Sequence, residues 1–185
     1  MIQILVIVMF ISLWLFAPEN AFAQNSNARQ KTQELVASLS KSKYKKKERG
    51  NFAFEKYIEI KSEAVVKNNV KEYAGNYEAE DSNFRVELLI ANDGKIEGNG
   101  YETYFQIGNR ENFTLKNAKI EGALLTAEKV YSNGRTEKLE AVFINRTVIE
   151  GKNPNQIESR KTSYGLGFVA GNGNSTQRVF CEFKP

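Results

Sequence analysis

The sequence predicts an all-β fold, in which a single antiparallel meander closes into a small barrel or packs as a sandwich after a short N-terminal helix. Two observations predict it. Apolar and polar residues alternate in several segments, which is typical of strands with one buried face. Turn-forming sequences separate these segments, and only two prolines follow residue 23. Few strand breakers and many short alternating segments favour a continuous, curling sheet.

The first 23 residues form the first expected segment. Residues 1–18 carry no charged side chain and are almost wholly apolar, and Ala21-Phe22-Ala23 follows with the small-x-small pattern that signal peptidase cleaves. We therefore expect a signal peptide over residues 1–23 and a secreted or periplasmic protein. The alternative is an uncleaved membrane anchor, because the amino terminus is the only positive charge ahead of the apolar run.

Residues 24–50 form the second expected segment, a basic helical arm or linker. It holds eight Lys and Arg against two Glu, although the whole chain has a net charge of only +4. Helix-forming residues over 30–39 place Leu35, Val36 and Leu39 on one stripe, which predicts a short helix docked on the body.

The basic run after that helix suggests contact with an anionic surface, such as a membrane. The residues concerned are Lys41, Lys43, Lys45, Lys46, Lys47 and Arg49. The interpretation that the sequence favours is a solvated linker, since like charges repel each other, and surface contact is the alternative. Nucleic acid is not expected as a partner of an exported protein.

Residues 51–185 form the third expected segment, an antiparallel β domain. Phe52 to Ile60 and Phe84 to Ile90 show the clearest alternation. Asn92-Asp93-Gly94 and Ser132-Asn133-Gly134 supply hairpin turns. The other expected strands are 73–79, one starting at 95, 101–107, 113–120, 123–131, 135–145, 157–164, 166–170 and 177–183.

A short repeat runs through this domain. Lys95-Ile96-Glu97-Gly98 recurs as Lys119-Ile120-Glu121-Gly122, and Val148-Ile149-Glu150-Gly151 is a looser third copy. The simplest interpretation is a strand with an exposed charge, followed by a bulge or turn at the glycine.

The residue inventory excludes several kinds of chemistry. The chain has no histidine, which removes Ser-His-Asp and Cys-His catalysis and His-ligated zinc or haem. Two aspartates beside turns cannot form an Asp-rich calcium loop. Cys181 alternates with Val179 and Phe183, which predicts a buried, unreactive thiol. We expect neither a metal nor a cofactor.

Five residues are candidates for ligand binding. Glu150 lies close to Arg146 in an otherwise apolar stretch, and Tyr101, Tyr104 and Phe105 form an aromatic group. The interpretation that the sequence favours for them is an ordinary cross-strand ion pair and aromatic core packing. No residue is assigned a catalytic role.

One pair of features resembles a known family. Gly75-Asn76-Tyr77 in an early strand and Arg178 in the last strand are similar to the lipocalin arrangement, in which an arginine covers an aromatic residue of the first strand. Here Tyr77 stands in place of the family's tryptophan, and the helix that follows the lipocalin barrel is missing. The resemblance implies a closed antiparallel barrel with a small ligand in its mouth.

Together these features predict an exported, non-enzymatic β domain that binds a small ligand, a peptide or a cell-envelope component. One alternative is a histidine-independent hydrolase that uses paired glutamates, since 19 glutamates follow residue 23. Another alternative is a surface or structural protein whose sheet makes protein contacts.

Overall fold

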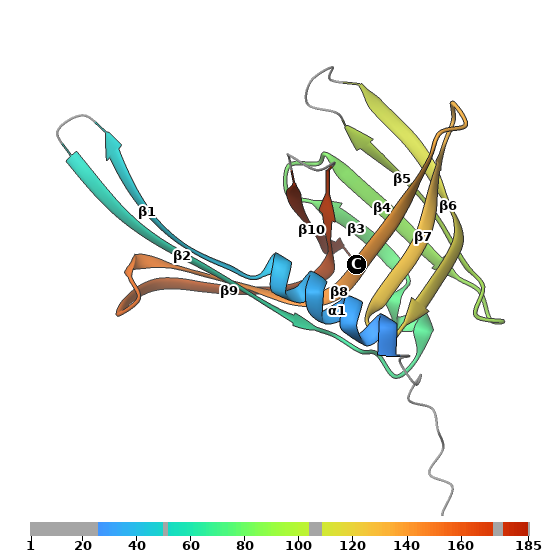
Figure 1. Cartoon of the computed structure of the whole chain (residues 1–185), viewed down its shortest axis with the longest axis horizontal. Helices are drawn as coiled ribbons and strands as arrows, with labels where there is room; N and C mark the ends of the chain where they lie inside the picture. Colours follow the sequence, from blue (N-terminus) through green and yellow to red (C-terminus); the bar gives the residue numbers. More distant parts are fainter. Residues whose placement is uncertain (1–25, 50–51, 104–108, 172–175, 185) are drawn as a thin grey trace, which may run out of the picture.

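A computed structural model of the chain describes residues 26–49, 52–103, 109–171 and 176–184 (Figure 1). Its elements are α1 (Ser26–Leu39), β1 (Lys41–Arg49), β2 (Phe52–Ala64), the short 3-10 helix η1 (Val70–Tyr73), β3 (Gly75–Ala79), β4 (Phe84–Ile90), β5 (Ile96–Thr103), β6 (Arg110–Glu121), β7 (Leu124–Tyr131), β8 (Thr136–Asn153), β9 (Gln156–Ala170) and β10 (Gln177–Lys184).

Eight of the strands form a closed ring. Strands β3 to β8 pair in chain order, β10 pairs with β3, and β9 joins β10 to β8. Every pairing is antiparallel. The predicted antiparallel meander after a short helix is therefore confirmed, and it closes on itself as a ring of eight strands.

The interior of the ring is packed with side chains. Residues at alternate positions of each strand point inward, so Phe84, Val86 and Leu88 of β4 are at most 4% exposed. Tyr77 and Phe143 are fully buried, and their ring centroids lie 5.7 Å apart. The ring therefore encloses the main hydrophobic core of the protein.

Helix α1 lies on the outside of the ring wall. Its buried residues, Ala28, Thr32, Leu35 and Leu39, recur every three or four positions and so form one face. This face packs on outward-facing residues of the wall, namely Ala123, Leu124, Val142 and Ile144. The predicted docked helix is confirmed, and it covers a wall of the ring rather than plugging its interior.

Strands β8 and β9 continue beyond the ring as a sheet arm. We define the sheet arm as β1, β2, residues 145–153 of β8 and residues 156–163 of β9. Its strand order is β1-β2-β8-β9, and Figure 1 shows it projecting to the left of the ring. Residues 156–162 are all exposed although successive side chains alternate between faces, so neither face of this part is covered.

The favoured interpretation of residues 41–49 as a solvated linker is wrong. These residues form β1 and pair with β2 over their whole length, from Lys41 opposite Ile60 to Arg49 opposite Phe52. Hydrogen bonds to β2 pair the backbone N–H and C=O groups of this segment. It can therefore form a strand without apolar alternation of its own. The expected boundary between residues 50 and 51 falls between two strands of one hairpin.

Several expected strands are longer than their patterns suggest. The segments 157–164 and 166–170 are one strand, β9, and β8 continues eight residues past the expected end at Asn145. Part of the expected strand 101–107 belongs to β5, and residues 104–107 lie outside the described part of the chain.

The glycines of the short repeat have three different positions. Gly98 lies within β5, where an added Cβ would come 2.8 Å from the carbonyl oxygen of Glu87. Gly122 has a φ of 61° in the turn between β6 and β7, and Gly151 lies at a register shift between β8 and β9. The three glycines therefore lie in a strand, a turn and a bulge. The repeat is a similarity of short sequences and not a repeated structural unit.

We predict that Leu39→Ala lowers the free energy of unfolding by about 2–5 kcal/mol, because it leaves a cavity between α1 and the wall. Leu39 is 6% exposed, whereas Leu89, which is 51% exposed, provides a matched control. Leu89→Ala should change stability by no more than about 0.5 kcal/mol. Urea unfolding followed by circular dichroism measures both, and equal effects would contradict the docking of α1.

Candidate functional site

Six polar side chains meet inside one end of the ring, and we call this group the ion cluster. The end is the one at which β5 and β7 finish and β6 and β8 begin. The members of the ion cluster are Glu102, Glu111, Lys129, Tyr131, Arg135 and Glu137. They come from four consecutive strands, β5 to β8, and from the hairpin turn between β7 and β8.

Lys129 is at the centre of the ion cluster. It is only 6% exposed, and its Nζ lies 2.7 Å from Glu102 and 2.9 Å from Glu137. The ammonium group also lies 5.7 Å from the ring centroid of Phe113. A buried ammonium is costly without partners, and here two carboxylates and an aromatic face replace its water.

Tyr131 and Arg135 complete the ion cluster. The Tyr131 hydroxyl lies within hydrogen-bond distance of both Glu102 and Glu137. Burial and the two carboxylates raise the pKa of Tyr131 far above its ordinary value, so it remains a protonated donor. The Arg135 guanidinium lies 2.6 Å from Glu111 and 4.0 Å above the Tyr131 ring.

This arrangement ties strands together and does not resemble a hydrolase site. A glycosidase needs one protonated carboxyl group and a second carboxylate on either side of a bound substrate. Glu102 and Glu137 instead share one ammonium and one hydroxyl. Within the described residues, no group of three potential metal ligands has a geometry suited to an ion.

A shallow groove of about 620 Å³ lies along the outside of β4 to β7. Its polar lining includes Arg85, Asn99, Tyr101, Asn112, Thr114 and Lys116. The Tyr101 ring is covered by Arg110 at 3.8 Å, and its hydroxyl donates to Glu78 at 3.3 Å. Arg85 donates to Asn76 at 2.8 Å. Tyr101 and Arg85 of the groove are therefore already paired within the protein.

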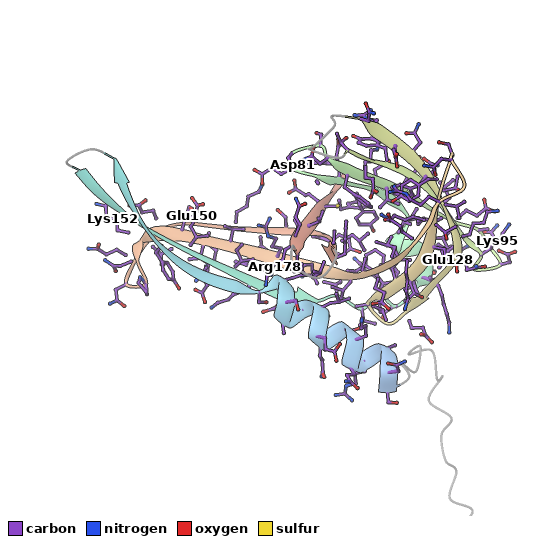
Figure 2. All side chains as sticks on the ribbon, turned by 45° about the horizontal axis from the view of Figure 1, so that its top comes forward. Asp81, Lys95, Glu128, Glu150, Lys152 and Arg178 are labelled. Carbon is purple, nitrogen blue, oxygen red and sulfur yellow. The ribbon has the colours of Figure 1, made fainter. Side chains whose placement is uncertain are left out.

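The predicted ligand-binding residues do not form one site among the described residues. Tyr101 lies on β5, whereas Arg146 and Glu150 lie on the part of β8 that belongs to the sheet arm, with β6 and β7 between. Figure 2 shows Glu150 on the sheet arm, far from Lys95 on the ring. Tyr104 and Phe105 lie outside the described part of the chain.

Arg146 is held at the base of the sheet arm. Its guanidinium lies 5.0 Å from the ring centroid of Phe180, and burial lowers the pKa of its side chain. The register of β8 places Arg146 opposite Ser62 and Ser163, and Glu150 opposite Ile58 and Ser159. Both residues are thus on the sheet arm, in which the basic strand β1 also lies.

The residues that resemble the lipocalin arrangement do not pair in this structure. Tyr77 is fully buried, and its hydroxyl donates to the carbonyl oxygen of Tyr73 at 2.7 Å. Arg178 is exposed and donates to the carbonyl oxygen of Ser38 at the end of α1 (Figure 2). Arg178 therefore ties α1 to β10 and leaves Tyr77 to the aromatic core.

The position of Lys129 could have indicated the ion cluster from the sequence. Leu125, Ala127, Lys129 and Tyr131 alternate along β7, and all four are buried. A lysine at an inward-facing position requires a buried carboxylate partner. The partner residues come from β5 and β8, and only the ring topology shows which glutamates they are.

No family model, curated protein or solved structure matches the chain. Among the described residues, no helix has both the length and the apolar character needed to cross a membrane.

We predict that Lys129→Met lowers the free energy of unfolding by about 3–5 kcal/mol, because it removes the buried ammonium between Glu102 and Glu137 and leaves them only the more distant guanidinium of Arg135. Lys138→Met is the matched control, since Lys138 also pairs with a glutamate but is 70% exposed. Its expected cost is at most about 1 kcal/mol. Chemical unfolding measures the loss of stability in both variants. A loss for Lys129→Met no larger than that for Lys138→Met would show that the ion cluster does not hold the strands together.

Cys181 should resist thiol reagents in the folded protein. Its side chain is fully buried, and burial raises the pKa of the thiol well above its usual range. The thiolate that reacts is therefore both scarce and inaccessible. Labelling should be complete only in denaturant, and fast labelling of the native protein would contradict the packing of β10.

Proposed function

We propose that this protein is an exported, non-enzymatic binding protein that attaches to an anionic surface of the cell envelope through its sheet arm. The sheet arm itself is the observation that carries this proposal. Residues 156–162 leave both sheet faces exposed, and a sheet without a second layer is an unusual feature in a folded domain. Such a projecting element is well suited to contact another surface.

The charge of the sheet arm supports an anionic partner. Its twelve Lys and Arg residues outnumber its six Glu residues, whereas the chain as a whole is nearly balanced at 26 against 22. Half of those basic residues are on β1, where Lys41, Lys43, Lys45, Lys46, Lys47 and Arg49 are found. Each basic residue adds up to about 1 kcal/mol of attraction near an anionic membrane.

The packed ring makes a surface contact a better explanation than a small ligand held inside. Phe84, Phe143, Leu166 and Phe168 fill the described interior. At one end the ion cluster pairs its own charges. Export is supported by the apolar segment 1–18 and by Ala21-Phe22-Ala23.

We predict that the protein sediments with vesicles of phosphatidylglycerol and phosphatidylcholine, and not with vesicles of phosphatidylcholine alone. Raising the ionic strength from about 0.1 M to about 1 M shortens the Debye length from about 10 Å to about 3 Å and should release the protein. No binding to anionic vesicles at low salt would overturn the proposed function.

Two triple variants locate the contact. K45Q/K46Q/K47Q removes three charges from the sheet arm, and K95Q/K116Q/K138Q removes three exposed charges from the ring. The sheet-arm variant should lose most of its vesicle binding, while the ring variant should bind as the unaltered protein does. The reverse order would assign binding to the ring.

A further inference from the structure

We infer that the sheet arm meets an anionic lipid bilayer with one of its two faces, the face on the side of α1. We call it the helix-side face. This inference rests on the proposed function and adds an orientation and a lipid partner to it. The strand register carries the inference, because it sorts the charges of the sheet arm by face.

Strand β8 shows which face of the sheet arm lies on the same side as α1. Ile144 packs with α1 in the cluster outside the ring, whereas its neighbour Phe143 belongs to the core inside. Alternation along the strand then places Arg146, Val148 and Glu150 on the helix side. Arg146 lies over Phe180, which packs against the same outer cluster and confirms this side.

The register extends the helix-side face across four strands as far as Ile58 and Glu150, and across β1 and β2 alone beyond them. One row of opposed positions runs from Lys41 through Ile60 and Val148 to Lys161. The next row toward the tip begins with Lys43 and Ile58. In the described backbone, the helix-side positions of the sheet arm up to Glu150 and Ser159 include eight basic residues and one acidic residue. The basic ones are Lys41, Lys43, Lys45, Lys47, Arg49, Lys56, Arg146 and Lys161, and the acidic one is Glu150.

The opposite face has a different composition. Its rows pair Ser42 with Glu59 and Lys46 with Glu55. Over the same rows it includes three basic and four acidic residues. These are Lys46, Lys61 and Arg160, and Glu48, Glu55, Glu59 and Glu63. The two faces therefore differ strongly in charge, although they belong to the same strands.

The mixture of residues on the helix-side face fits a bilayer. Apolar positions on the neighbouring strands lie in the same rows of the register as basic positions of β1, and they include Phe52, Phe54, Ile58, Ile60 and Val148. Lipid-bound surfaces combine basic groups at the phosphates with apolar groups at the acyl boundary. Six of the eight basic residues are lysines, which act as point charges and suit a fluid layer of headgroups rather than one fixed ligand.

Two matched variants test the choice of face. K43Q/K45Q/K161Q removes three charges from the helix-side face, and K46Q/K61Q/R160Q removes three from the opposite face. Lys161 and Arg160 are adjacent and both exposed on β9; they differ in their face and in the ion pair that Lys161 makes with Glu182 at 3.7 Å. Thermal unfolding first shows that both variants keep the fold.

We predict that the helix-side variant binds phosphatidylglycerol vesicles roughly 100-fold more weakly, at about fivefold for each charge. The opposite-face variant should stay within about threefold of the unaltered protein. Equal losses would overturn the inference and leave the proposed function standing, since net charge alone would then control binding. Binding to inorganic polyphosphate but not to vesicles would assign the helix-side face to a soluble polyanion and would also overturn it.

Tryptophan fluorescence gives a second readout that does not depend on charge. The exported chain from Gln24 onward has no tryptophan, so a single one can be placed on either face. Ile58→Trp on the helix-side face should shift to the blue on vesicles and be quenched by brominated lipid. Tyr57→Trp on the opposite face should not, and the reverse pattern would contradict the orientation.

Discussion

The pairing of β8 with β9 is the interaction on which the rest of the structure depends. Residues 141–144 of β8 pair with β9 to close the ring, and the same two strands continue together to Asn153 and Gln156. The far part of β8 also pairs with β2, which in turn holds β1. Ring closure and the sheet arm are therefore one continuous set of hydrogen bonds, and the sheet arm projects from a closed core rather than from a flexible linker.

Helix α1 and the ion cluster stabilise the ring from different sides. The helix buries outward-facing residues of β7 and β8, and Arg178 secures its last turn. The ion cluster joins β5, β6, β7 and β8 at the end of the ring opposite to the sheet arm. Because the ion cluster satisfies its own charges, the basic helix-side face is the strongest unbalanced charge that the register reveals. The proposed attachment to lipid follows from that imbalance.

The sequence predicts the fold class and most strands because alternation is a local signal. Phe84 to Ile90 is predicted with its observed bounds, and the helix stripe of Leu35 and Leu39 is buried as expected. Strand β1 is not predictable in this way, because its lysine-rich sequence has no apolar alternation and is a strand through its pairing with β2. The site is less predictable still. Glu102, Lys129 and Glu137 meet across the ring, and the charge asymmetry of the sheet arm appears only when register aligns four strands.

Amide hydrogen exchange of the protein with and without phosphatidylglycerol vesicles tests the central claim most directly. Residues 156–162 of the sheet arm have no second layer, so their amides should exchange readily in solution and slow on the bilayer. The account predicts protection confined to residues 41–64 and 145–163 and to α1, with the wall of β4 to β6 unchanged. Protection over β4 to β6, or none in the sheet arm of protein that sediments with the vesicles, would contradict the account.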